Sequence, residues 1–112
     1  MGDDYHAFLY GLHHLKKVDV TFWSKEDGHP LRRRCAPMDF GPSRSAHNPA
    51  NRYHLWDYDS DVQQHTLSLL PDQIIAIDVT TETFRPAEFV TWAPIVWFVT
   101  RDWGAFSGSR AA

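Results

Sequence analysis

Residues 18–40 read VDVTFWSKEDGHPLRRRCAPMDF. Apolar and polar side chains alternate over Val18–Trp23, which is the period-two pattern of a β-strand with one buried face. The dipeptide Asp27-Gly28 follows, and its glycine tolerates the positive φ that a tight turn between two strands requires. A second strand-like run then covers Leu31–Phe40. This stretch therefore predicts an antiparallel hairpin.

The residues before the hairpin follow a helical period instead. Apolar side chains recur every three or four residues, which places them on one stripe of a helix over residues 4–16; they are Tyr5, Phe8, Leu9, Leu12 and Leu15. Asp3 or Asp4 is expected to cap this helix, because a short carboxylate can accept hydrogen bonds from the free amides of the first turn. An amphipathic N-terminal helix is predicted.

Downstream of the hairpin, the patterns predict three more strands, at residues 52–58, 64–70 and 74–80. Residues 41–51 contain Pro, Gly and Asn and are expected to form a loop, 59–61 a turn, 71–73 one helical turn, and 86–89 a short turn or helix. One helix followed by five short strands predicts a mainly β fold with α, a small five-stranded SH3/Sm-like antiparallel barrel. We expect a single domain over 1–112, with the helix at 4–16, the barrel at about 17–85 and a Trp-rich C-terminal extension at about 86–112.

Composition excludes several classes of protein. The chain has 112 residues, 43% of them apolar, and a net charge of −3, so nucleic-acid binding by bulk positive charge is excluded. A single cysteine, Cys35, rules out an internal disulfide framework and indicates a reducing compartment. No apolar run approaches the length of a signal peptide or a membrane span. A cytoplasmic protein without membrane contact is expected.

The order of these pieces resembles the WYL domain, a bacterial module with an Sm-like barrel. The resemblance covers about residues 5–89 and consists of segments in the family's order: Val18–Phe22, Arg33-Arg34-Cys35-Ala36-Pro37-Met38, Arg52-Tyr53-His54-Leu55, His65-Thr66-Leu67, Asp72-Gln73-Ile74 and Phe84. The name-giving tripeptide lacks its Trp here. His65 and Gln73 stand where the family usually has arginine, which bears on any anion pocket.

What the resemblance implies is a sensor in a transcription regulator. Family members usually join the barrel to a helix-turn-helix DNA reader, and the residues before this barrel are too few for one. We therefore expect a stand-alone regulatory module, without catalytic residues or cofactor. It would bind single-stranded nucleic acid or a small anionic, nucleotide-like ligand and dock on a separate DNA-binding protein.

The predicted ligand site centres on three consecutive arginines. A guanidinium group suits phosphate bidentately, and nearby aromatic rings offer the stacking surfaces that single-stranded nucleic acids require. The expected ligand-binding residues are Arg32, Arg33, Arg34, Arg52, Tyr53, Trp56 and His65. The alternative interpretation is that these arginines pair with Asp57, Asp59 or Asp61 on an exposed strand.

The C-terminal extension supports a second functional hypothesis. Trp, Phe and Tyr are enriched at the cores of protein interfaces, which predicts a homo-oligomerisation or protein–protein module that uses Trp92, Trp97, Phe98 and Trp103. The alternative is that the extension folds back and plugs the barrel or covers its edge.

Other chemistry-bearing residues carry weaker signals. The seven histidines lack metal-ligand spacing, so no metal site is expected. Residues 57–61 read DYDSD and are interpreted as an acidic turn, since a calcium loop needs Gly and Glu further on, where Val62 and Ser68 stand. Cys35 is expected to be a buried, inert thiol.

Overall fold

The computed structural model describes residues 2–43, 48–60 and 63–111. It is mainly β-structure with one N-terminal helix, and its longer elements in chain order are α1 (Asp3–His14), β1 (Lys16–Ser24), β2 (His29–Pro42), β3 (Asn51–Asp57), β4 (His65–Leu69) and β5 (Ile74–Thr83). Short 3₁₀ turns occupy Pro71–Gln73, Pro86–Glu88 and Gly104–Phe106, and the two-residue strands β6 (Val96–Trp97) and β7 (Ser109–Arg110) pair near the C-terminus. Within the described residues, no helix has the length and apolar character needed to cross a membrane.

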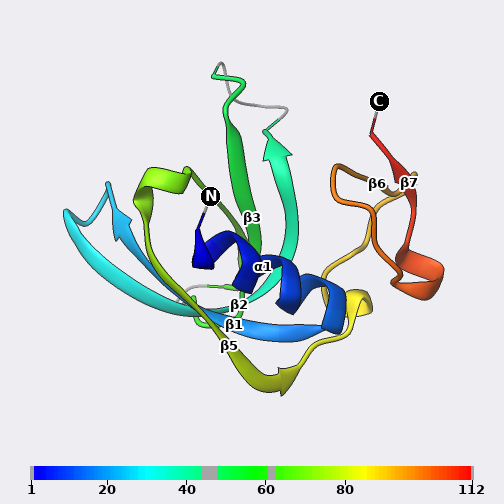
Figure 1. Cartoon of the computed structure of the whole chain (residues 1–112), viewed down its shortest axis with the longest axis horizontal. Helices are drawn as coiled ribbons and strands as arrows, with labels where there is room; N and C mark the ends of the chain where they lie inside the picture. The colour runs from blue at the N-terminus through cyan, green and yellow to red at the C-terminus, as the bar shows by residue number, and fades with distance from the viewer. Residues whose placement is uncertain (1, 44–47, 61–62, 112) are drawn as a thin grey trace.

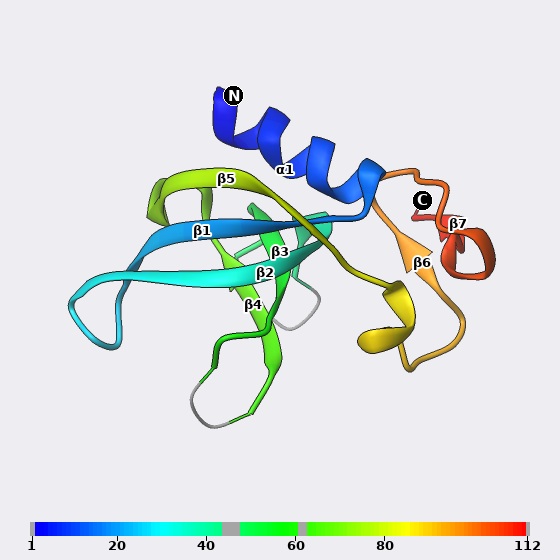
Figure 2. The same cartoon turned by 90° about the horizontal axis from the view of Figure 1, so that it is seen from below.

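Five strands form one antiparallel sheet in the order β4-β3-β2-β1-β5. The sheet is strongly bent, so β3 and β4 cross the direction of β1, β2 and β5 while α1 lies over one side (Figures 1 and 2). The predicted five strands and the helical turn at 71–73 are thereby confirmed. A register shift between Pro37 and Asp39 marks an irregularity in β2, and such bulges bend a strand.

The predicted hairpin is confirmed, and its second strand is longer than expected. Gly28 has φ +71°, and its N–H donates to the Ser24 carbonyl at 2.8 Å. β2 continues through Gly41 and Pro42 because these residues pair with Arg52 and Asn51 of β3. The predicted loop therefore begins only after Pro42, and its positions 44–47 lie outside the described residues, as do Asp61 and Val62 of the expected acidic turn.

The helix ends earlier than predicted, and its cap differs. Leu15 adopts the left-handed conformation with φ 57° and donates its N–H to the Gly11 carbonyl, which ends α1 at His14. Gly2 occupies the N-cap position, so the expected side-chain cap from Asp3 or Asp4 is wrong. Asp4 instead accepts a hydrogen bond from the Ile77 N–H of β5 at 3.0 Å. Its carboxylate therefore connects the helix to the edge of the sheet.

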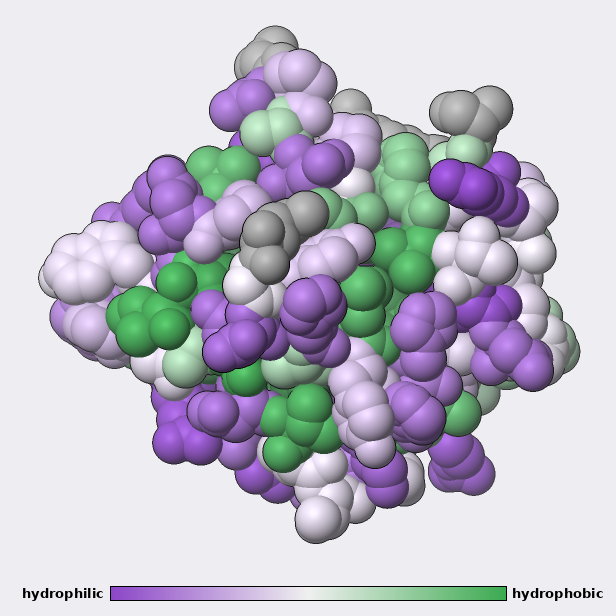
Figure 3. Space-filling view, viewed as in Figure 1, coloured by the Kyte–Doolittle hydropathy of each residue, from purple (hydrophilic) through white to green (hydrophobic). Residues whose placement is uncertain are grey.

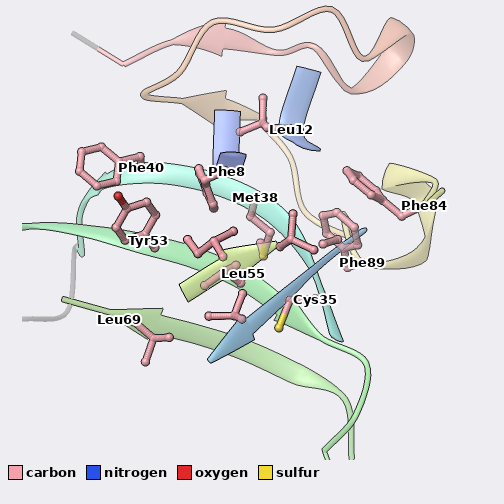
Figure 4. Packing of buried hydrophobic residues seen from close by; sticks show 14 of the residues in the cluster. Phe8, Leu12, Cys35, Met38, Phe40, Tyr53, Leu55, Leu69, Phe84 and Phe89 are labelled. Carbon is pink, nitrogen blue, oxygen red and sulfur yellow. The ribbon is translucent and has the colours of Figure 1, made fainter. Parts of the chain in front are cut away.

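The core lies between α1 and the bent sheet. Phe8 and Leu12 of the helix are fully buried, and Phe8 meets Tyr53 edge to face with ring centroids 5.0 Å apart. Figure 4 shows Phe8 pointing toward the labelled side chains of β3, Tyr53 and Leu55. Cys35 belongs to this cluster, and burial raises the pKa of its thiol far above the ordinary value. The prediction of a buried cysteine is confirmed.

The C-terminal segment, residues 84–111, folds back against the sheet. Side chains along β3 alternate between the two faces of the sheet, so Tyr53 and Trp56 point to opposite faces. Tyr53 packs on Phe8 of α1, whereas the Trp56 ring stacks on Phe89 of the segment with ring centroids 5.9 Å apart. The Trp103 indole donates to the Leu12 carbonyl at 2.9 Å and so ties the segment to the end of α1. The segment therefore packs on Trp56 of β3 and on the end of α1, and it forms a second layer against the sheet.

One buried ion pair fixes this layer in place. Asp39, next to the irregularity in β2, accepts hydrogen bonds from the backbone N–H groups of Phe98 and Val99 at 2.9 and 3.0 Å and from Arg101 Nη2 at 3.1 Å. The Arg101 guanidinium also donates to the Met38 carbonyl and lies between two indole rings, 3.9 Å from the Trp97 centroid and 4.4 Å from the Trp103 centroid. Desolvation lowers the pKa of Arg101 to about 10, which leaves it charged at neutral pH.

We predict that Arg101→Met lowers the free energy of unfolding by about 3 kcal/mol, because the change leaves the buried Asp39 carboxylate without its counter-charge. Arg110→Met, at an exposed position, should change the free energy of unfolding by less than about 0.5 kcal/mol. Urea denaturation followed by circular dichroism measures both values. Similar small losses for the two variants would contradict the anchoring role of Arg101.

Candidate functional site

The three arginines of β2 border an open polar cleft of about 420 Å³. We call it the charged cleft; its wall consists of Lys17, Asp19, Arg32, Arg33, Arg34, Tyr58, Asp59 and Glu82. The β1–β2 register places Asp19 opposite Arg34 and Thr21 opposite Arg32, so Arg32 and Arg34 lie on the same face of the sheet as Asp19. The hairpin therefore brings cations and carboxylates together.

Asp19 holds two of these arginines. Arg34 contacts it bidentately, with Nε to Oδ1 at 2.8 Å and Nη2 to Oδ2 at 3.0 Å. Arg32 reaches the same carboxylate through Nη2 at 3.2 Å, and Arg34 Nη1 also donates to Glu82 at 3.0 Å. The hydrogen bond from Arg34 is the main cause of a lowered pKa at Asp19. Asp19 therefore occupies the position where an anionic ligand would meet both guanidinium groups.

Lys17 and Tyr58 continue this network toward β5. Lys17 pairs with Glu82, and its ammonium lies 4.1 Å from the centroid of the Tyr58 ring, a cation–π distance. The Tyr58 hydroxyl donates to Glu88 at 2.9 Å, and burial raises the pKa of Tyr58 above its ordinary value. Each of these groups already has a partner within the protein.

Arg33 points to the other side of the strand from its two neighbours. Its Nη1 donates to the Asp59 carbonyl at 3.0 Å, and its Nε lies 3.9 Å from a carboxylate oxygen of the buried Asp57. The sequence left open whether these arginines pair with carboxylates, and they do. The side chains of Arg32 and Arg34 pair with Asp19, and Asp61 lies outside the described residues. Among the four cations of the charged cleft, Arg32 is the most accessible, with 63% of its side chain exposed. The charged cleft is close to charge-balanced.

The other predicted ligand residues do not join this cleft. Tyr53 is 3% exposed and belongs to the core, so its ring offers no open face for base stacking. Trp56 stacks on Phe89 and donates to Gln64 at 3.3 Å. Arg52 lies at the far end of β3, where its Nε is buried without a hydrogen-bond partner among the described atoms. His65 borders a separate cavity of about 180 Å³ that Arg33 shares with Glu26 and Asp27.

The four predicted interface residues differ in how exposed they are. Trp97 and Trp103 are buried and hold the C-terminal segment on the protein. Their rings are therefore not exposed to a partner protein, which agrees with the alternative that the extension folds back. Phe98 is partly buried; a Cβ atom on Gly41 would lie 2.4 Å from its ring, which explains why glycine stands there. Trp92 keeps 42% of its surface exposed.

Trp92 and Phe98 border a second cleft, of about 240 Å³, between the sheet and the C-terminal segment. We call it the Trp92 cleft; its wall consists of Met38, Asp39, Pro42, Ser43, His54, Thr66, Trp92, Pro94, Val96, Trp97 and Phe98. Trp92 meets the buried Trp97 edge to face, with centroids 5.8 Å apart, so a fixed ring supports the exposed one. Figure 3 shows apolar surface in the region between β4 and the C-terminal segment.

Polar groups in this second cleft are few and fixed. His54 uses both ring nitrogens, to Ser68 Oγ at 2.8 Å and to the Gly41 carbonyl at 2.9 Å. The Thr66 hydroxyl has a weak contact with Met38 Sδ at 3.9 Å. Asp39 is 8% exposed and is neutralised by Arg101. The Trp92 cleft is therefore mostly apolar, and the one carboxylate among its described wall residues is paired with Arg101.

Sequence reasoning missed the residues that build this cleft. Asp39 ends a strand-like run and Arg101 lies beyond the last recognised element, so no local pattern connects them. The signals that were present are a carboxylate inside an otherwise apolar run, Cys35–Phe40, and a lone arginine between Trp97 and Trp103. A charged residue in such surroundings needs a partner when it is buried.

Comparisons with known proteins identify no relative. No protein-family model matches the chain, and neither curated proteins nor solved structures match it significantly. The resemblance to WYL domains therefore stays a prediction, and the two clefts are judged on their geometry.

We predict that Asp19→Asn raises the affinity of the charged cleft for a labelled single-stranded 12-mer DNA about tenfold at low salt. The change frees Arg32 and Arg34 for phosphate, and charge-assisted bonds to phosphate are strong. Fluorescence anisotropy measures the binding, which added salt should weaken. Asp72→Asn, the same charge change at an exposed residue of the 71–73 turn, is the control. Equal gains for both variants would contradict a role for Asp19 in occupying the arginines.

Acid should destabilise the protein in part through the same carboxylate. The pKa of Asp19 is lowered in the folded state from its ordinary value of 3.8. The unfolded chain therefore binds this proton first, and stability is lost as the pH falls through the folded-state pKa. Urea midpoints between pH 7 and pH 3 should fall less steeply for Asp19→Asn than for the wild type and Asp72→Asn. Three parallel profiles would contradict this assignment.

Proposed function

We propose that this protein is a non-catalytic binding module and that its ligand enters the Trp92 cleft. The observation that carries this proposal is an exposed tryptophan, Trp92, that packs on the buried Trp97 in the wall of a mostly apolar cleft. Ligand sites are typically concave and mostly apolar, with a few placed polar groups, and the Trp92 cleft has these properties. It is smaller than the roughly 300–1,000 Å³ typical of drug-sized ligands, which favours a ligand or side chain of one or two rings.

The composition of the wall suggests how binding would act on the rest of the molecule. Met38, His54 and Thr66 belong to the sheet, whereas Trp92, Pro94 and Phe98 belong to the C-terminal segment. A ligand that contacts both parts stabilises their docked arrangement, because binding to one state shifts the population toward it. Such a ligand would give the module the sensor role that the sequence resemblance implies.

We also propose that the fold is an SH3/Sm-like barrel. A helix, five antiparallel strands in the order β4-β3-β2-β1-β5 and a 3₁₀ turn between β4 and β5 are features expected of an SH3/Sm-like barrel, as the sequence resemblance implies. Within that proposal, the module is WYL-like, cytoplasmic and dependent on a separate DNA-binding protein for any effect on transcription.

Binding of nucleic acid or a small anion at the charged cleft receives less support. Arg34 already binds Asp19 and Glu82, Arg33 lies beside Asp57, and Asp19 also holds the exposed Arg32 through one nitrogen. An anion that bridges Arg32 and Arg34 would have to displace the Asp19 carboxylate. Of the four aromatic residues predicted to contact a partner protein, only Trp92 and Phe98 remain accessible. The Trp92 cleft retains one element of this second hypothesis, recognition by exposed aromatic rings.

We predict that benzofuran, a neutral two-ring compound without an N–H group, binds the protein weakly and at one site. Trp92→Ala should weaken this binding at least about fivefold, because base-like and aromatic rings gain much of their affinity from such stacking surfaces. Trp23→Ala is the matched control, since Trp23 is 45% exposed on β1 and does not line the cleft. Saturation-transfer NMR titration measures the affinity. No binding, or equal losses for both variants, would overturn the proposed function.

A further inference from the structure

The Trp92 cleft contains an acceptor that its own protein does not fully use. Asp39 Oδ1 accepts from Phe40 N–H, Val99 N–H and Arg101, at 3.0, 3.0 and 3.1 Å. Its second oxygen, Oδ2, accepts only from the Phe98 N–H, at 2.9 Å, among the described residues. A carboxylate oxygen has about two lone-pair sites. One acceptor position on Oδ2 therefore remains, on a side chain that lines the cleft and is otherwise buried.

Charge selects the kind of donor that fits this position. Asp39 is the one carboxylate among the described residues of the cleft wall, and Arg101 already neutralises it at 3.1 Å. A cationic ligand would have to approach that guanidinium and would be repelled by it, while an anion would meet the carboxylate itself. A neutral N–H donor suffers neither repulsion and gains a charge-assisted hydrogen bond.

The remaining wall selects the shape. Two aromatic residues, Trp92 and Phe98, and two rigid prolines, Pro42 and Pro94, line the cleft. Both ring nitrogens of His54 already have hydrogen-bond partners within the protein. His54 therefore has no free nitrogen to accept a hydrogen bond from a ligand. Rigid aromatic walls that stack on a ligand ring, together with one fixed acceptor, favour a flat molecule that carries its N–H in the plane of the ring.

We propose that the natural ligand of the Trp92 cleft is a neutral aromatic nitrogen heterocycle, with its ring between Trp92 and Phe98 and its ring N–H donating to Asp39 Oδ2. This inference rests on the proposed function and adds the chemical class of the ligand. The acceptor is part of the anchor of the C-terminal segment, so the ligand bonds directly to the group that holds the two layers together.

Two probes of nearly identical shape test the proposal without altering Asp39, whose replacement would also release the C-terminal segment. Indole carries the ring N–H, and benzofuran has an oxygen in its place. Saturation-transfer NMR titrations on the full chain should give about tenfold tighter binding for indole, as expected for one hydrogen bond to a charged acceptor. Trp92→Ala should weaken both probes, and Trp23→Ala neither.

The outcomes separate this inference from the proposed function. Equal affinities that both depend on Trp92 would overturn the role of Asp39 while the cleft remains a binding site. If neither indole nor benzofuran binds, both proposals are overturned. Indole binding that Trp92→Ala does not weaken would place the indole site, and with it the N–H acceptor, outside the cleft and would overturn the inference.

N-methylindole provides a second measurement, because it keeps the nitrogen ring and lacks the donor. It should bind no better than benzofuran. Binding as tight as that of indole would contradict a hydrogen bond to Asp39 and attribute the difference between the first two probes to ring electronics.

Discussion

The Asp39 carboxylate is the interaction on which the arrangement of the two layers depends. It lies next to the irregularity of β2, where the strand bends, and accepts hydrogen bonds from two consecutive backbone N–H groups of the C-terminal segment as well as from Arg101. A segment with little regular structure cannot satisfy its own backbone groups. Asp39 supplies acceptors for two of them, and the stacking of Arg101 between Trp97 and Trp103 places the aromatic rings around that contact.

This anchor also determines where a ligand can bind. Phe98 and Val99 are held at β2 by Asp39, and the nearby Trp92, Pro94 and Val96 line a cleft together with residues of the sheet. Trp97 faces inward and supports Trp92, which stays exposed. The charged cleft has the opposite character: its cations are paired with carboxylates from neighbouring strands, so its groups stabilise the sheet locally and leave little free charge for a ligand. The charged cleft therefore contributes to the stability of the sheet, whereas the proposed binding site lies beside the anchor of the C-terminal segment.

Local patterns predicted most of the sheet and little of the candidate site. The alternation at 18–23, Asp27-Gly28 and the breaks around 71–73 depend on neighbours in sequence, and the strands they predict are present. The helix end at His14 depends on the left-handed Leu15, which no helical period reveals. The arginine run was identified correctly as a cluster, but its pairing with Asp19 follows from the cross-strand register. Asp39 and Arg101 are 62 residues apart, and their contact requires the tertiary fold.

The most direct test of this account is to map the binding site residue by residue. In a ¹H–¹⁵N correlation spectrum titrated with indole, the account predicts shifts at the Trp92 indole N–H and at the amides of Met38, Phe98 and Val99, which surround Asp39. The amides of Lys17, Arg34 and Glu82 should not move. Shifts confined to the charged cleft, or spread evenly over the protein, would contradict the central claim that the docked C-terminal segment and the sheet together form the binding site.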